Sequence, residues 1–232
     1  MAEKTGFSRR DLKSPDEFIS TFGRTVTWCK ANLRKVAAGA IAVVAVVALA
    51  LGTQAYLRWK ENKADRDLWP TLDRARQLLQ APDAADPSQL ATVEQFLQGH
   101  ARTHRNTRAA MYSLYYLGSI AFLRGDYDLS ITQFRAGIAT GKEAGIMRYL
   151  LRQGIASSLE AKGDLPAAAA AYRDAGAVAE ANMKAQARMG EARILELSGK
   201  KAEAASLYRL ILQESPETPL RDLVEIRLAQ TE

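Results

Sequence analysis

The sequence predicts an all-α protein: a single membrane-spanning helix near the N-terminus, followed by a solenoid of helical hairpins that ends in a capping helix. Two observations lead to this fold class. An uncharged apolar run covers residues 36–57, and a pattern of glycine, small residue and aromatic residue recurs three times after residue 106. We therefore divide the chain into a tail (1–35), a transmembrane helix (36–57), a juxtamembrane connector (58–70) and a repeat domain (71–232).

Composition and charge fit a globular or membrane protein. Hydrophobic residues make up 47% of the chain, and the formal net charge is +6. The first 35 residues hold eight basic and four acidic side chains, which leaves only +2 for the rest. A nucleic-acid-binding domain would carry more positive charge, so we expect no nucleic-acid partner. The single cysteine, Cys29, precedes the apolar run, which excludes an intramolecular disulfide and a lipid-attachment cysteine after the run.

The apolar run from Val36 to Leu57 is long enough, at about 1.5 Å per residue, to cross a hydrocarbon core of about 30 Å. Basic residues flank both ends, and Tyr56 and Trp59 provide interfacial aromatics. The alternatives are a buried soluble helix and a cleaved signal sequence. A polar leader of 35 residues is long for a signal sequence, which favours the membrane span.

The charges that flank the span and the length of the domain behind it favour opposite orientations of the span. The 20 residues before the span carry four Lys or Arg, and the 20 after it carry six. A long domain crosses a membrane largely regardless of its charge, whereas a short basic tail is readily retained. We therefore expect the N-terminus in the cytoplasm and the repeat domain outside it.

The tail carries signals for an amphipathic helix. Ser14 and Pro15 are typical of a helix start, and Glu17 lies three residues after the serine. Apolar residues then recur at intervals of three or four up to Val36. We expect this helix to lie on the inner leaflet; the alternative is a helix that binds a cytoplasmic partner.

The repeats begin near residue 106. Gly125, Gly163 and Gly199 each follow a helical apolar pattern, and each precedes an aromatic residue by nine positions. A glycine in this place ends one helix in a left-handed conformation, and a second antiparallel helix follows. Small residues five positions after each glycine are predicted to lie where the two helices cross, and the aromatics to fill the space between hairpins. The small residues are Ser130, Ala168 and Ala204, and the aromatics are Phe134, Tyr172 and Tyr208.

These features resemble the tetratricopeptide repeat superfamily over residues 106–216. The spacings of 38 and 36 residues are close to its period of about 34, Leu117-Gly118 matches its leucine-glycine pair, and Pro216 matches its closing proline. The second copy departs at Arg152 and Ala156. An earlier hairpin is predicted from Thr71–Gln80 and a helix opened by Asp86-Pro87, and a capping helix with Leu220, Leu223 and Leu228 on one side is predicted over 219–229.

The resemblance implies a concave surface, lined by the first helix of each hairpin, that binds proteins. An alternative for the tyrosines at 112, 115 and 116 is that they pack against the preceding hairpin. The predicted groove residues are Tyr112, Tyr115, Ser119, Phe122, Gln153, Ser157, Met189, Arg193 and Glu196.

No residue pattern predicts catalysis. His100 and His104 have a spacing that lets two imidazoles share a metal, but they are the only histidines, and we expect both to be exposed on the surface. There is no glycine-rich phosphate loop and no set of residues for a nucleophilic triad. We therefore expect no enzyme activity, cofactor, metal or small-molecule substrate.

The layout of tail, span and four-hairpin domain also resembles the YfgM-type ancillary subunits of the bacterial Sec translocon. That resemblance implies an inner-membrane protein with a periplasmic domain that hands secreted polypeptides to periplasmic chaperones. Its partners would be translocon subunits, chaperones or secreted chains, with lipid around residues 36–57 and the tail. The alternative is a structural scaffold subunit of an envelope machine, such as a pilus, secretion or cytochrome-maturation complex.

Overall fold

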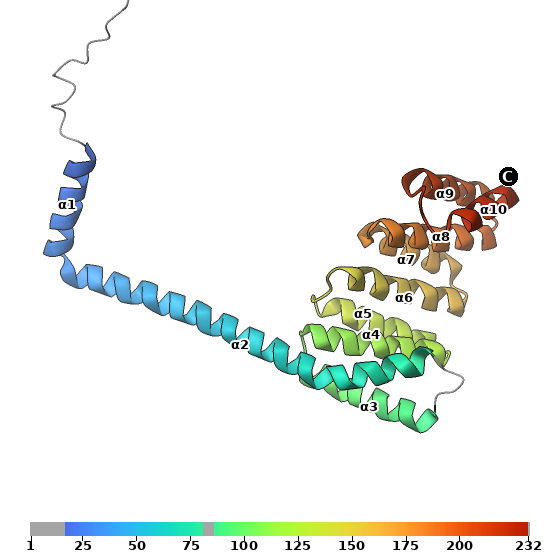
Figure 1. Cartoon of the computed structure of the whole chain (residues 1–232), viewed down its shortest axis with the longest axis horizontal. Helices are drawn as coiled ribbons and strands as arrows, with labels where there is room; N and C mark the ends of the chain where they lie inside the picture. Colours follow the sequence, from blue (N-terminus) through green and yellow to red (C-terminus); the bar gives the residue numbers. More distant parts are fainter. Residues whose placement is uncertain (1–16, 81–85, 232) are drawn as a thin grey trace, which may run out of the picture. The chain divides into compact units, whose positions relative to one another are not determined.

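The computed structural model describes residues 17–80 and 86–231, and these are all-α, with ten helices and no strand (Figure 1). The chain forms two compact units, residues 1–57 and 58–232, and helix α2 contributes to both. The helices are α1 (Glu17–Ala31), α2 (Leu33–Gln80), α3 (Pro87–Thr103), α4 (Arg108–Leu123), α5 (Tyr127–Ala139), α6 (Ile146–Lys162), α7 (Leu165–Val178), α8 (Ala181–Leu197), α9 (Lys201–Glu214) and α10 (Arg221–Thr231).

The first unit holds α1 and the apolar part of α2. Helix α1 begins at Glu17, and the predicted capping residue Ser14 lies outside the described residues. The sequence predicted one uninterrupted pattern up to Val36, but the structure ends α1 before Asn32. At this break the Trp28 carbonyl accepts two hydrogen bonds from Asn32, one from its side-chain amide at 3.0 Å and one from its backbone N–H at 2.9 Å.

The apolar part of α2 is the candidate membrane span. An 18-residue window of this helix has a mean hydropathy of 2.5, and none of the window is buried in the structure. Val43 and Leu49 are 64% and 71% exposed. The helix is therefore long and apolar enough to cross a membrane, as predicted.

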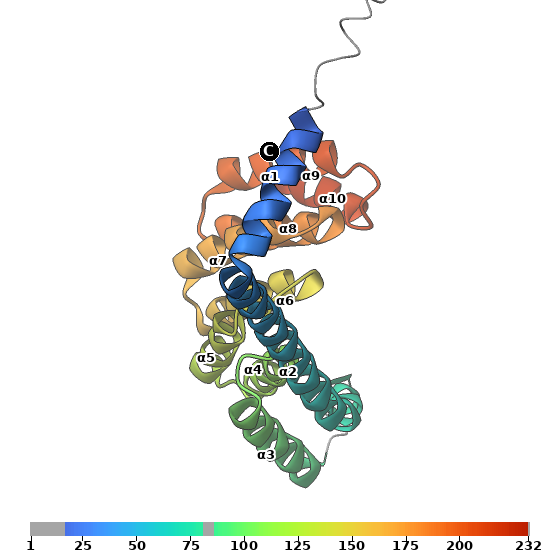
Figure 2. The same cartoon turned by 90° about the vertical axis from the view of Figure 1, so that its left-hand side faces the viewer.

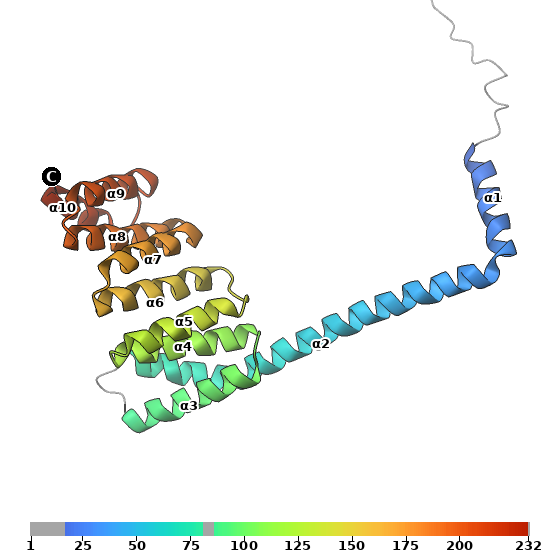
Figure 3. The same ribbon diagram turned by 180° about the vertical axis from the view of Figure 1, so that it is seen from behind.

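The second unit is a stack of antiparallel helices. Each helix from α3 to α10 packs against the next one in the chain, and α4 also touches α6 while α6 touches α8. Figure 1, Figure 2 and Figure 3 show this stack from three sides. The hairpins α4–α5, α6–α7 and α8–α9 correspond to the three predicted repeats, and α10 closes the stack.

The predicted helix ends are confirmed at the glycines. Gly125, Gly163 and Gly199 have φ values of 78°, 86° and 77°, in the left-handed region that glycine adopts without steric cost. Helices α5 and α7 then begin at aspartate caps, since the side chains of Asp126 and Asp164 accept hydrogen bonds from backbone N–H groups three residues later. Each hairpin turn is thus specified locally by a glycine, and in two of the three by an aspartate as well.

The predicted crossing residues are confirmed too. Ser130, Ala168 and Ala204 are each 0% exposed. The Ser130 hydroxyl donates to the Gly118 carbonyl at 2.8 Å, so this buried hydroxyl has a hydrogen-bond partner at the crossing. Small side chains at these positions let the two helices of a hairpin approach closely.

The aromatic residues join consecutive hairpins. A Cβ atom added to Gly118 or Gly154 would lie 2.8 or 2.5 Å from the Phe134 ring, so this ring lies against α4 of its own hairpin and α6 of the next. A Cβ atom added to Gly190 of α8 would likewise lie 2.6 Å from the Tyr172 ring. Gly154 and Gly190 were not singled out from the sequence, although they are 36 residues apart and supply the flat surface that each ring needs.

Two predicted features differ from the structure. Residues 58–70, predicted as a connector, are a helical part of α2 whose Ala64 and Leu68 are 0% and 2% exposed, because they continue the apolar face of Leu72. In α10, Leu223 is 43% exposed instead of packing inward, and Val224 is buried in its place.

Candidate functional site

A groove of about 450 Å³ opens between α4 and α6, with contributions from α2, α5 and α8. Its walls come mostly from the first helices of two neighbouring hairpins. The lining residues are Leu79, Tyr115, Ser119, Phe122, Leu123, Phe134, Tyr149, Leu150, Gln153, Gly154, Ser157 and Gln186.

The structure brings together five of the nine predicted groove residues. They come from only two helices: Tyr115, Ser119 and Phe122 from α4, and Gln153 and Ser157 from α6. The spacings along each helix are three or four residues, which keeps their side chains on one face.

The wall formed by α4 and α5 is aromatic. The Tyr115 ring lies 5.8 Å from the Phe134 ring and 5.4 Å, edge-on, from the Tyr116 ring. Phe122 lies 5.6 Å from the Tyr127 ring. Burial raises the pKa of Tyr115, so its hydroxyl stays neutral and able to donate a hydrogen bond.

The wall formed by α6 is more polar. Tyr149 donates to the Gln186 side-chain oxygen at 3.2 Å, and burial raises the pKa of Tyr149 to about 12. Within the described residues, the buried side-chain oxygen of Gln153 has no hydrogen-bond partner. Buried acceptors are normally satisfied, so this oxygen is an exception within the wall of the groove.

Tyr112 belongs to a different hollow. It lines a depression of about 260 Å³ between α2 and α4, together with Trp69, Tyr116, Arg76 and Arg108. Tyr116 also packs against the core of the first hairpin, which is the alternative role considered for the tyrosines. Tyr112 and Tyr115 thus line separate hollows, although they are only three residues apart on α4.

The three predicted residues on α8 are engaged inside the solenoid. Met189 packs against the last core cluster. Arg193 forms an ion pair with Glu160 of α6, and Glu196 accepts a hydrogen bond from the Tyr208 hydroxyl at 3.0 Å. None of the three lines the groove.

These contacts form a repeated set of tyrosine, glutamate and arginine. Tyr172 donates to Glu160 at 2.8 Å, and Glu160 binds Arg193. One repeat later, Tyr208 donates to Glu196, which lies 3.8 Å from the Arg227 side chain. Each set links three consecutive helices through its central glutamate. The first set links α6, α7 and α8, and the second links α8, α9 and α10.

Charge and hydrogen bonding compete at Glu160. Partial burial raises the pKa of this carboxyl, but the hydrogen bonds from Arg193 and Tyr172 outweigh burial, and the net pKa is below its ordinary value. The first repeat has Phe122 and Phe134 at the positions of Glu160 and Tyr172. The concave face therefore changes from open and apolar at the first repeat to ion-paired at the later ones.

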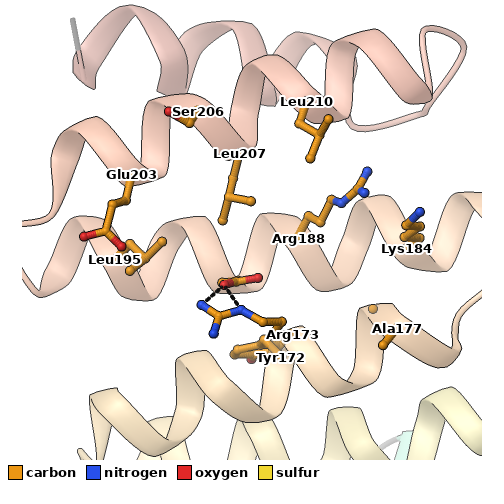
Figure 4. A pocket seen from close by; sticks show the side chains of 12 residues that line it. Tyr172, Arg173, Ala177, Lys184, Arg188, Leu195, Glu203, Ser206, Leu207 and Leu210 are labelled. Atoms are coloured by element: carbon orange, nitrogen blue, oxygen red, sulfur yellow. Dashed lines mark hydrogen bonds and ion pairs between the residues drawn. The ribbon is translucent and has the colours of Figure 1, made fainter.

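A second hollow, of about 550 Å³, lies between α7, α8 and α9 (Figure 4). Its cations are matched by acids: Arg173 binds the buried Glu191 at 2.6 and 2.9 Å, as the dashed lines in Figure 4 show. Lys184 and Arg188 bind Glu214 at 3.2 and 2.8 Å. Its charges are thus used within the fold, which makes the α4–α6 groove the better candidate site.

The prediction that both histidines are exposed is wrong. His100 is 6% exposed, with Nε2 3.0 Å from the Ala64 carbonyl oxygen and Nδ1 2.9 Å from the Ser113 hydroxyl. His104 lies 3.4 Å from Asp67. The face of α3 that carries them packs against α2 and α4, which the spacing of four residues alone does not reveal. Among the described residues, no three metal-ligating side chains gather at one place.

Comparison with known structures gives a likeness to the crystal structure of YrrB, described as a TPR protein with an unusual peptide-binding site. The TM-score is 0.50 at 18% sequence identity, over 74% of this chain and 78% of that one. No protein-family model matches the chain, and no curated protein matches it. The likeness shows that the repeat domain has a tetratricopeptide-like fold.

Proposed function

We propose that this chain is a membrane-anchored protein-interaction module whose α4–α6 groove binds an extended segment of a partner polypeptide. The observation that carries this proposal is the groove itself, which Tyr115 and Phe122 of α4 line together with the polar Gln153 and Ser157 of α6. Aromatic side chains offer large contact areas at low entropic cost, and a polypeptide supplies both apolar side chains and N–H donors.

The fold supports this proposal in a second way. The structurally similar protein YrrB is described as having a peptide-binding site. Stacked helical repeats expose extended concave surfaces of the size that a peptide or helix needs. The apolar part of α2 would keep this surface beside a membrane.

The narrower part of the proposal concerns location and partners. We propose that the chain lies in a bacterial inner membrane with its repeat domain in the periplasm, next to the Sec translocon, where it passes secreted polypeptides to chaperones. The order of tail, apolar helix and repeat domain, which resembles the YfgM-type subunits, supports this assignment. A groove for unfolded, apolar segments suits a protein that meets emerging chains.

A matched pair of positions allows a direct test. Leu123 ends α4 and lines the groove, whereas Leu197 ends α8 at the equivalent repeat position and does not. Both are exposed, at 46% and 62%. A photocrosslinking amino acid at 123 in the full chain should capture polypeptides in cells, and the same residue at 197 should capture few.

Substitutions in the groove give the energetic test. Phe122→Ala should weaken binding of the partner by about 1 kcal/mol or more, and Gln153→Ala should weaken it as well, so both changes should reduce crosslinking at position 123. Circular dichroism first checks that both variants keep the fold. Equal crosslinking at 123 and 197 would reject the groove as the binding site. Translocon subunits, chaperones or secreted chains among the captured proteins support the narrower proposal, whereas one stoichiometric component supports the scaffold alternative.

A further inference from the structure

We propose that one edge of the repeat domain is a docking surface for anionic phospholipid headgroups. This edge, called the basic edge below, consists of residues 58–63 of α2, the α3–α4 turn (104–107) and the α5–α6 loop with the first residue of α6 (140–146). The proposal rests on residues 36–57 crossing the bilayer. It concerns a surface of the folded domain that does not include the groove.

Three contacts hold the basic edge together. The Lys60 ammonium donates to the Arg105 carbonyl at 3.2 Å, and the Arg108 backbone N–H donates to Glu61 at 3.0 Å. Lys142 of the α5–α6 loop forms an ion pair with Glu61 at 3.3 Å. Two loops that are distant in the sequence therefore meet the first turn of α2 after the apolar run.

The sequence keeps this turn close to a headgroup layer. Lys60 follows Leu57 by three residues, so the chain can carry its backbone no more than about 11 Å from the end of the apolar run. The headgroup and interfacial region on each side of a bilayer is roughly 5–8 Å deep, from total and hydrocarbon thicknesses of about 40–45 and 30 Å. A loop bound to Lys60 or Glu61 lies within reach of that layer.

The side chains on this edge fit an anionic interface. Arg58, Lys63 and Arg105 are exposed, and within the described residues none of them forms an ion pair. Trp59 and Ile146 are 54% and 51% exposed on the same edge. Basic side chains beside exposed tryptophan are typical of membrane interfaces, where the cations attract anionic lipid.

The opposite edge differs in its pairing. It contains the turns after α4, α6 and α8. Three of its cations, Arg124, Lys162 and Lys200, are paired with the carboxylates of Glu94, Asp128 and Glu203, whereas Lys201 forms no ion pair within the described residues. Positive charge that is not neutralised by neighbouring acids is thus more prominent on the edge next to the apolar run, which is where lipid would be met.

The test places a fluorophore at each edge of the full chain. With Cys29→Ser as background, Ala144→Cys labels the basic edge and Lys162→Cys labels the opposite edge, and the protein is reconstituted in nanodiscs containing lipids with nitroxide headgroups. Quenching at 144 should exceed quenching at 162, and it should be about twofold or more stronger in discs rich in phosphatidylglycerol than in discs of phosphatidylcholine, since the attraction is electrostatic.

Charge reversal supplies the specificity control. Lys63→Glu with Arg105→Glu should remove the extra quenching in the anionic discs, whereas Lys200→Glu with Lys201→Glu, an equal change of charge on the opposite edge, should leave it unchanged. Circular dichroism checks the fold of both variants. Equal quenching at 144 and 162, or equal quenching at 144 in both lipids, overturns the proposal. A chain that does not enter the discs at all overturns its premise, the membrane span.

Discussion

Individual side chains explain why the hairpins stack in register. The ring of Phe134 fits between Gly118 and Gly154, and the ring of Tyr172 lies on Gly190. A methyl group at such a glycine would occupy the space of the ring, since interiors are close-packed. The glycines are therefore as much a part of the inter-hairpin contact as the aromatic residues.

The replacement Gly154→Ala tests this contact. The new Cβ would lie 2.5 Å from the Phe134 ring, so we expect overpacking to lower the free energy of unfolding by about 1–3 kcal/mol. Gly99→Ala in α3 is the matched control, because a Cβ there meets nothing within 4 Å, and it should be neutral or stabilising by up to about 1 kcal/mol. Urea unfolding of both variants decides; equal stability would contradict the close ring contact.

His100 gives the fold a pH dependence of known sign. Burial lowers the pKa of His100 from its ordinary value of 6.5, and the hydrogen bond to the Ala64 carbonyl opposes this with a smaller effect. The unfolded chain takes up a proton near pH 6.5, whereas the folded chain does so only at lower pH. Stability from neutral His100 is therefore present above pH 6.5 and is lost as the pH falls below it.

We therefore expect the Tm of the native chain to fall between about pH 7.5 and pH 5, and to fall less in His100→Gln. The groups that face this ring are Ser113 on α4, His104 in the α3–α4 turn, and Asp65 and Asp67 on α2. An unchanged pH dependence in the variant would assign the effect to these neighbours. Thermal scans monitored by circular dichroism provide the measurement.

Among the helices, two kinds of contact hold successive first helices together. At the first repeat the contact is apolar, through Phe134. At the later repeats a tyrosine ring packs between helices, and its hydroxyl donates to a glutamate. This glutamate also forms an ion pair with an arginine, which belongs to α8 in the second repeat and to α10 in the third. The polar version links three helices at once but fills the concave face with its own charges, so it leaves less surface for a partner.

Substitutions of Tyr172 separate the ring from the hydroxyl. Tyr172→Phe removes the hydrogen bonds of the hydroxyl with Glu160 and Ser157 while Glu160 keeps Arg193, so the loss of stability should be about 0.5–1.5 kcal/mol for each bond. Tyr172→Ala also removes the buried ring and should cost about 3–5 kcal/mol. Equilibrium unfolding compares the two. A larger loss for the phenylalanine than for the alanine variant would mean that the polar set dominates the packing.

Helix α2 carries both the apolar candidate span and the first helical segment of the repeat domain. Its residues Ala64, Leu68 and Leu72 belong to the core of the first hairpin, so the repeat domain begins within this helix.

Topology follows from the long domain behind the span, which we expect outside the cytoplasm. Protease added to intact spheroplasts should degrade the repeat domain and spare an epitope placed at the N-terminus. Permeabilised cells provide the control in which both are degraded. Protection of the repeat domain until permeabilisation would reverse the orientation and reject the periplasmic assignment.

Local sequence signals were sufficient for the hairpins. A left-handed glycine, a small residue five positions later and an aromatic residue four positions after that specify a turn, a crossing and a ring, because each acts within one hairpin or on its immediate neighbour. The apolar run likewise predicts its helix from composition alone.

Other features depend on which helix faces meet, and a single helix pattern does not contain that information. The spacing of His100 and His104 is the same for an exposed and for a buried pair, and only the packing of α3 between α2 and α4 makes His100 buried. Arg193 and Glu196 occupy groove positions by register, yet partners 31 to 33 residues away in the sequence, Arg227 and Glu160, draw them into ion pairs. The open part of the groove is therefore set by long-range contacts, which periodicity does not encode.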